Sequence, residues 1–96
     1  MATLKWLPEA LADVERLHEF LKDIDMQAAD QCVEVILKGS RLLKATPHLG
    51  RPMQDDLGRR ELFMQFGAGA YVLRYRLEGA GDVVIIRVWH SREDRK

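Results

Sequence analysis

The chain has 96 residues, 47% of them hydrophobic and 31% charged, as expected for one small folded domain spanning residues 1–96. Its 15 basic and 15 acidic residues cancel, which argues against a uniformly basic nucleic-acid-binding protein, although basic side chains are in excess after residue 58. A single cysteine excludes an internal disulfide. The N-terminus does not resemble a signal peptide and no apolar run reaches membrane-spanning length, so we expect a cytoplasmic protein.

Two amphipathic helices are predicted after a short strand at 3–7. Pro8 suits the first turn of the first helix. The second helix should begin at Met26, capped by Asp25, and end near Thr46. The short connection between the helices predicts a helical hairpin. Spacing of three and four residues assigns the apolar face of the first helix to Leu11, Val14, Leu17, Leu21 and Ile24, with charged residues such as Asp13 in solvent.

The second half of the chain has the pattern of a β-sheet. Residues 46–58 contain two prolines and two glycines and are expected to form a loop. Apolar residues then alternate with polar ones, or form a continuous apolar run, at 60–66, 71–77 and 83–89, with glycine-containing turns between these strands. The expected fold is α+β: an N-terminal strand and a two-helix hairpin packed on a mainly antiparallel sheet of about four strands.

The sequence offers few residues for metal or cofactor chemistry. Its three histidines, His18, His48 and His90, lie far apart, and Cys32 has no companion thiol, so we expect neither a metal nor a cofactor. Because Cys32 lies among Val33, Val35 and Ile36, it is expected to fill space in the core.

Arginines on the predicted strand 71–77 form the first candidate site. Arg74 and Arg76 are two residues apart and should point to the same side of the sheet, where their guanidinium groups could bind phosphate or carboxylate. They could equally be solvent-facing side chains that pair with acids such as Glu61.

His90 is the second candidate, because it follows the last predicted strand. A histidine there could transfer a proton near neutral pH and, beside arginines, could support phosphodiester cleavage with an RNA 2′-hydroxyl as nucleophile. The alternative is a structural histidine in the turn to the tail, with Arg92 and Asp94 pairing locally.

Several motifs in this order resemble those of the RelE/ParE superfamily, the toxins of bacterial type II toxin–antitoxin systems. The resemblance covers nearly the whole chain. It is carried by W-x-P-E-A-x-x-D-x-E at 6–15, P-x-x-G-R-P at 47–52, R-R-E-L-F at 59–63, G-A-Y-V-L-R-Y-R at 69–76 and V-I-I-R-V-W-H-S-R-E-D-R at 84–95.

The resemblance implies one of two activities. RelE-like toxins cleave messenger RNA in the ribosomal A site with basic residues and a Tyr or His near the end of the last strand, whereas ParE-like toxins poison DNA gyrase and need no nuclease centre. The ending H-S-R-E-D at 90–94 is closer to the ParE-like branch. A gyrase-binding toxin that is not a conventional enzyme is therefore expected. The alternative is a ribosome-dependent endonuclease with His90 as acid–base group and Arg74, Arg87 and Arg92 stabilising phosphate charge. A third is a module kept only for operon autoregulation.

The resemblance also implies a cognate, ParD-like antitoxin as partner, with DNA gyrase, or the ribosome and its mRNA, as target. The antitoxin-binding candidates are Leu11, Leu17, Phe20, Arg74 and Arg76. The target-binding candidates are Arg74, Arg76, Arg87, His90 and Arg92.

Overall fold

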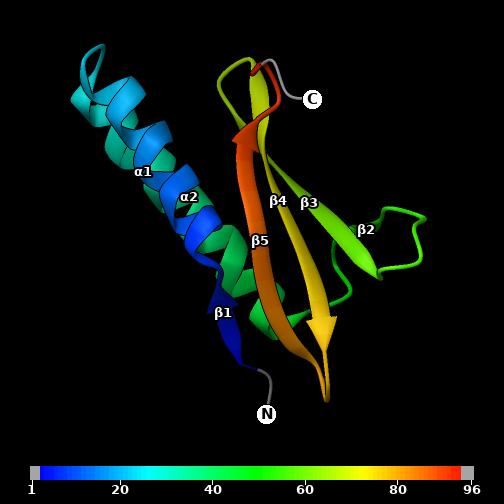
Figure 1. Ribbon diagram of the computed structural model, residues 1–96. Helices are drawn as coiled ribbons and strands as arrows, with labels where there is room; N and C mark the ends of the chain where they lie inside the picture. The colour runs from blue at the N-terminus through cyan, green and yellow to red at the C-terminus, as the bar shows by residue number, and fades with distance from the viewer. Residues whose placement is uncertain (1–2, 94–96) are drawn as a thin grey trace.

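A computed structural model describes residues 3–93 as two helices and a five-stranded sheet (Figure 1). None of the described helices is long and apolar enough to cross a membrane. The elements in chain order are β1 (Leu4–Trp6), α1 (Pro8–Lys22), α2 (Met26–Ala45), β2 (Arg51–Pro52), β3 (Arg59–Phe66), β4 (Gly69–Glu78) and β5 (Asp82–His90).

The helix boundaries follow the local sequence signals. Pro8 occupies the first turn of α1, where its missing N–H costs nothing. The Asp25 carboxylate caps α2 by accepting hydrogen bonds from the N–H groups of Gln27 (3.0 Å) and Ala28 (3.4 Å). At its other end, α2 stops at Ala45, two residues before Pro47. The predicted helical hairpin is therefore confirmed.

The strands lie in the order β1-β5-β4-β3-β2, with β1 parallel to β5 and all other neighbours antiparallel. A two-residue turn with Gly67 at φ 63° joins β3 to β4. The sheet has five strands instead of the expected four or so, because Arg51–Pro52 in the predicted loop pairs with β3. A two-residue strand that contains proline has no alternating pattern from which it could be predicted.

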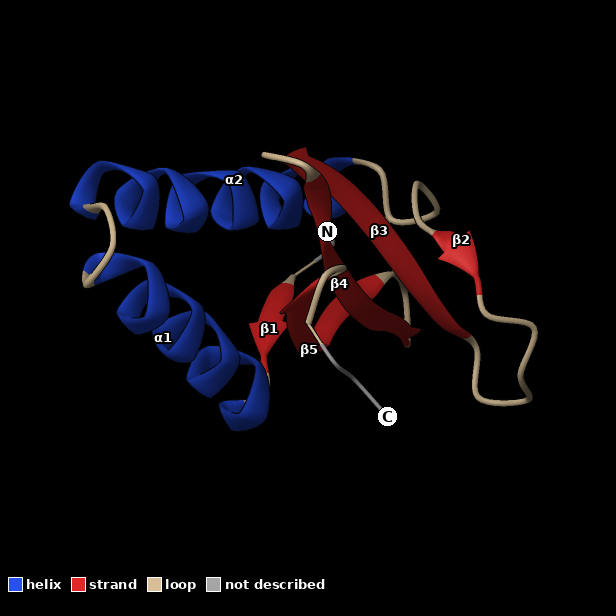
Figure 2. Ribbon diagram, turned by 90° about the horizontal axis from the view of Figure 1, so that it is seen from above, coloured by secondary structure: helices blue, strands red, loops and turns tan. Residues whose placement is uncertain are grey.

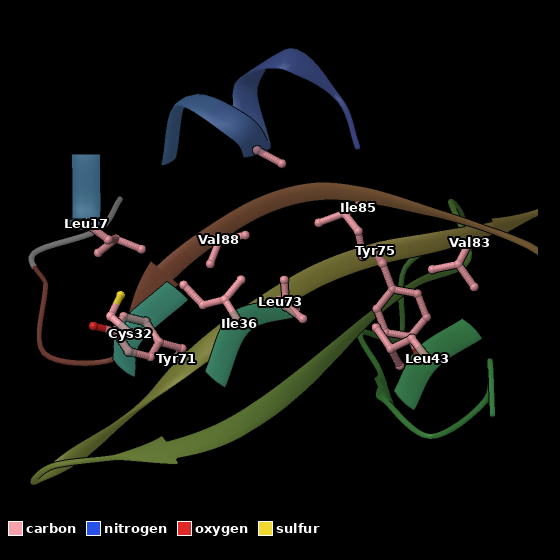
Figure 3. Close-up of a cluster of buried hydrophobic side chains, with 11 residues drawn as sticks. Leu17, Cys32, Ile36, Leu43, Tyr71, Leu73, Tyr75, Val83, Ile85 and Val88 are labelled. Atoms are coloured by element: carbon pink, nitrogen blue, oxygen red, sulfur yellow. The ribbon is translucent and has the colours of Figure 1, made fainter. Parts of the chain in front are cut away.

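Both helices cover one face of the sheet, and the core lies between these two layers (Figures 1 and 2). Figure 3 shows Cys32, Ile36 and Leu43 of α2 against Tyr71 and Leu73 of β4. Cys32 is fully buried, as the sequence predicts. Strand β5 adds Val83, Ile85 and Val88 to this cluster, and α1 adds Ala10 and Leu17.

The buried face of α1 is largely the one predicted. Leu17 is buried, and Val14 and Leu21 pack against the core. Leu11 and Ile24 were wrongly placed on this face, since they are 50% and 69% exposed. Asp13, expected in solvent, is buried beside Ala10 because its carboxylate has partners on β5.

No helix within residues 3–93 covers the second face of the sheet. Since Tyr71, Leu73 and Tyr75 point into the core, alternation along β4 places Arg74 and Arg76 on this open face. The two arginines therefore point to the same side of the sheet, as predicted.

Tyr75 fixes the loop that leads from α2 to β2. Its hydroxyl donates to the carbonyl of Pro47 (2.7 Å) and accepts from the N–H of Gly50 (2.8 Å). A β-carbon on Gly50 would lie 2.5 Å from the Tyr75 ring, so only glycine fits this close approach. Arg60 holds the same loop by donating to the carbonyls of His48 and Gly50.

Candidate functional site

A groove of about 660 Å³ opens at the end of the sheet where β5 stops and β3 turns into β4. One wall is the second half of α1, and the other is formed by the β3–β4 turn and the end of β5. Its lining is mainly apolar. The lining residues are Arg16, Leu17, Phe20, Leu21, Phe66, Gly67, Ala68, Tyr71, His90, Arg92 and Glu93.

His90, the last residue of β5, lies in this groove with both ring nitrogens held by the backbone. Nδ1 accepts a hydrogen bond from the N–H of Arg92 (3.2 Å), and Nε2 lies 3.3 Å from the carbonyl oxygen of Phe66. A ring that accepts at Nδ1 carries its proton at Nε2, where it can donate to that carbonyl. The ring also contacts Tyr71 edge-on, with centroids 4.9 Å apart. His90 therefore joins three segments of the chain.

Glu93 ties the end of the described chain to α1. Its carboxylate accepts from the guanidinium of Arg16 and from the backbone N–H of His90 (3.0 Å). Arg16 also reaches the carboxylate of Asp13, 3.4 Å away. The local partner expected for Arg92, Asp94, lies outside the described residues.

The groove is lined by one buried tyrosine, Tyr71, whose hydroxyl contacts the Cys32 thiol in the core, and both groups are chemically inert. Tyr71 is 2% exposed, and burial together with its hydrogen bond to Cys32 raises the pKa of its phenol well above the usual range. Burial likewise raises the pKa of the Cys32 thiol. Both groups are therefore neutral at physiological pH and cannot act as a ready base or nucleophile.

Arg87 does not reach the groove, because Asp13 holds it at the edge of β5. Strand β1 covers this edge only as far as Ile85, and beyond it the Asp13 carboxylate accepts from the N–H of Val88 (2.8 Å) and from Arg87 (2.8 and 3.0 Å). Burial acts to raise the pKa of Asp13, but these hydrogen bonds and the charges of Arg87 and Arg16 outweigh it and lower the pKa.

Arg74 and Arg76 lie on the open face and are both paired with acids. The Arg74 guanidinium donates to Glu61 (3.2 and 2.9 Å) and stacks over the Trp89 ring, 4.8 Å from its centroid. Arg76 pairs with Glu78 at 2.7 Å. The geometry therefore matches the alternative in which these arginines are solvent-facing side chains paired with acids such as Glu61. Each guanidinium nevertheless keeps exposed surface.

The fold brings together some of the predicted site residues and separates others. Leu17, Phe20, His90 and Arg92 line the one groove, whereas Leu11 lies outside its lining and the two β4 arginines lie across the sheet. Sequence reasoning missed Arg16, Phe66 and Tyr71 as groove residues. For Arg16 the sequence held one signal, since this residue directly precedes Leu17, a predicted antitoxin-binding residue on α1. For Phe66 and Tyr71 it held none. Within residues 3–93, no three side chains of His, Cys, Asp or Glu gather as a ligand set for a metal.

Comparisons with known proteins identify the family. The family model described as "ParE toxin of type II toxin-antitoxin system, parDE" matches residues 4–95. The chain belongs to the ParE toxin family. Similar curated relatives include Toxin RelE3 of Caulobacter vibrioides, 36% identical over 99% of this chain and the whole of that protein. Toxin RelE1 of the same organism is 35% identical over 90% of this chain and 89% of that protein.

A solved structure shares the fold of this ParE toxin. It is described as "Chromosomal ParDE TA system from P. aeruginosa" and superposes with a TM-score of 0.78 at 24% identity, covering 94% of this chain and 96% of that one. The α+β fold predicted from the sequence pattern, a helical hairpin on a mainly antiparallel sheet, is thereby confirmed.

Proposed function

We propose that this ParE toxin arrests bacterial growth by binding DNA gyrase, and that a cognate antitoxin neutralises it. The observation that carries the proposal is the geometry of His90. Because both of its ring nitrogens are engaged by backbone groups, the imidazole has no free position from which to take or give a substrate proton. The residue best suited to nuclease chemistry therefore acts as a structural group.

The pairing of the arginines supports the same proposal. Phosphodiester cleavage needs cationic groups aimed at the charge that develops on phosphate. Here Arg74, Arg76 and Arg87 each bind a carboxylate, and none of the three lines the groove of His90. The zero net charge adds to this argument, since a ribosome-directed nuclease must bind a polyanion.

A ribosome-dependent mRNA endonuclease is the second candidate. Two curated relatives carry the name RelE, and His90 shares its groove with Arg92 and Arg16. On this alternative, substrate binding would have to break the contact between His90 and Phe66 to free the ring.

The antitoxin would dock over the groove and continue around the molecule. Phe20 lines the groove and is 68% exposed, so an apolar segment in the groove could bury it. Leu11 is 50% exposed but lies nine residues earlier, on the opposite side of α1, so covering it as well requires a partner that passes around the helix. Reaching Arg74 and Arg76 as well requires a partner that wraps around the sheet, as a short chain that folds on binding can do. We propose the exposed parts of Arg74 and Arg76 as gyrase contacts that the antitoxin would cover.

The experiment compares the two targets directly. Purified toxin is added to a gyrase supercoiling reaction and, separately, to translating ribosomes followed by primer extension on the mRNA. Arg76→Glu should weaken gyrase inhibition, while the matched charge reversal Lys44→Glu, at the exposed end of α2, should not. Cuts in ribosome-bound mRNA without any effect on supercoiling would refute the proposal.

A further inference from the structure

Three exposed apolar side chains lie together in the hairpin tip, residues 19–30, where α1 ends and α2 begins. Phe20 and Ile24 are 68% and 69% exposed, the highest fractions among the large apolar side chains within residues 3–93, and Met26 is 51% exposed. Figures 1 and 2 show that the tip projects away from the sheet. Single exposed apolar residues are common on protein surfaces, but a group of them marks a contact with another molecule.

The backbone of the hairpin tip is fixed by hydrogen bonds. The N–H groups of Ile24 and Asp25 both donate to the carbonyl of Leu21, at 2.9 and 2.7 Å. The Asp25 carboxylate then caps α2. Ile24 follows Phe20 by about one helical turn, so the two side chains lie near each other. The exposed side chains therefore stand on an ordered backbone, which reduces the conformational entropy lost on binding.

The hairpin tip is also acidic. It has four acidic residues and one basic residue, namely Glu19, Asp23, Asp25 and Asp30 against Lys22. Lys22 lies 3.5 Å from Glu19, and His18 lies 3.3 Å from Asp30, but both carboxylates remain mostly exposed. Negative charge in solvent thus borders the apolar side chains.

This charge discriminates between the molecules that could cover the tip. A second copy of the chain would bring two acidic tips together, which like-charge repulsion opposes. An antitoxin docked over the main groove reaches Phe20, but Ile24 and Met26 lie outside the groove lining. DNA gyrase has the complementary charge, because an enzyme that binds DNA presents basic side chains to the phosphates.

We propose that the hairpin tip is a contact surface for DNA gyrase. Phe20, Ile24 and Met26 pack on an apolar part of the enzyme, and Asp23 meets basic side chains beside it. The inference rests on the proposed function and adds a contact separate from the arginines of the open face. It also gives a reason for neutralisation: an antitoxin that fills the main groove covers Phe20 and leaves gyrase an incomplete surface.

The apolar contact is tested with full-length toxin, purified DNA gyrase and relaxed plasmid. Ile24→Ala should raise the toxin concentration that half-inhibits supercoiling about tenfold, through lost apolar burial. Leu57→Ala is the matched control, since Leu57 is 67% exposed in the connection between β2 and β3, and should change it less than about twofold. The affinity of Ile24→Ala for the purified product of the reading frame directly upstream of the toxin gene, measured by calorimetry, should stay within about twofold of wild type.

The charge is tested with a second matched pair. Asp23 is exposed at the C-terminal end of α1, where a lysine favours the helix dipole, so Asp23→Lys should fold. Asp23→Lys should weaken inhibition of supercoiling about fivefold, most clearly at low salt. Glu15→Lys makes the same charge change at an exposed position eight residues earlier and should alter inhibition less than about twofold.

The outcomes separate this inference from the proposed function. If wild-type toxin inhibits supercoiling and both Ile24→Ala and Asp23→Lys match it, the inference is wrong while the proposed function stands. If wild-type toxin neither binds gyrase nor inhibits supercoiling, both fail. The inference is also overturned if Ile24→Ala loses affinity for the upstream product but not for gyrase, or if it converts a wild-type dimer into a monomer.

Discussion

Asp13 of α1 binds Arg87 of β5 through both carboxylate oxygens, at 2.8 and 3.0 Å. The same carboxylate accepts from the N–H of Val88, which β1 is too short to pair. One buried side chain thus completes the edge of β5 and holds α1 on the sheet.

Replacing Asp13 with alanine should destabilise the fold by about 2–3 kcal/mol, since the N–H of Val88 would lose its partner and Arg87 its counter-charge. The cost stays below that of a fully buried pair because the Arg87 side chain is 37% exposed. Denaturant unfolding measures it. Glu15→Ala, an exposed carboxylate on the same helix, should change stability by less than about 0.5 kcal/mol. Equal effects of the two substitutions would contradict the proposed role of Asp13.

The lowered pKa of Asp13 predicts acid sensitivity. Because the folded-state pKa lies below the unfolded value of about 3.9, the stabilisation is present above pH 4 or so and is lost as pH falls through the folded pKa. Asp13→Asn should therefore flatten the loss of stability in that acidic range, measured by urea unfolding at a series of pH values. Some slope will remain, since hydrogen bonds from Arg59 and Thr3 lower the pKa of Asp55 and Asp82. An unchanged slope would rule out this assignment.

The Tyr75 hydroxyl should make a measurable contribution to the stability of the fold. Tyr75→Phe removes the acceptor for the buried N–H of Gly50 and the donor to Pro47, at a cost of about 1–3 kcal/mol. Tyr71→Phe loses only a weak contact with the Cys32 thiol and should cost less. Thermal unfolding of the two variants gives the comparison, and a larger loss for Tyr71→Phe would be inconsistent with the hydrogen bonds described.

The parts of the fold that could be predicted from the sequence are those specified by neighbouring residues. The caps and the glycine turns are local, so the helical hairpin and the three long strands were predicted. Strand β2 depends on a partner strand, and the parallel pairing of β1 with β5 joins the two ends of the chain. Neither leaves a periodic pattern.

The site was harder to predict than the fold. The groove is assembled from α1, the β3–β4 turn and the end of β5, and no sequence spacing relates these segments. His90 was recognised as important, but whether its nitrogens were free depended on the backbone of Phe66, 24 residues away. Asp13 was expected in solvent because a carboxylate on a helix usually lies there.

Phe20 should contribute to antitoxin binding without contributing to stability. At 68% exposure beside the groove, Phe20→Ala should weaken binding of the antitoxin by about 1–2 kcal/mol, or roughly tenfold, through lost apolar burial. Ile24→Ala is the matched control, because Ile24 is 69% exposed but outside the groove lining. Calorimetric titration of both variants decides the matter, and equal losses would mean that the groove does not direct the docking.

The most direct test of the central claim is gyrase supercoiling in the presence of the His90→Asn variant. Asparagine can accept from the N–H of Arg92 in place of Nδ1 but cannot serve as an acid–base group. The proposed mechanism predicts that this variant and the wild-type toxin inhibit supercoiling equally, and that the antitoxin reverses both. A toxin that leaves supercoiling unchanged and instead cleaves ribosome-bound mRNA, with cleavage lost in His90→Asn, would contradict it.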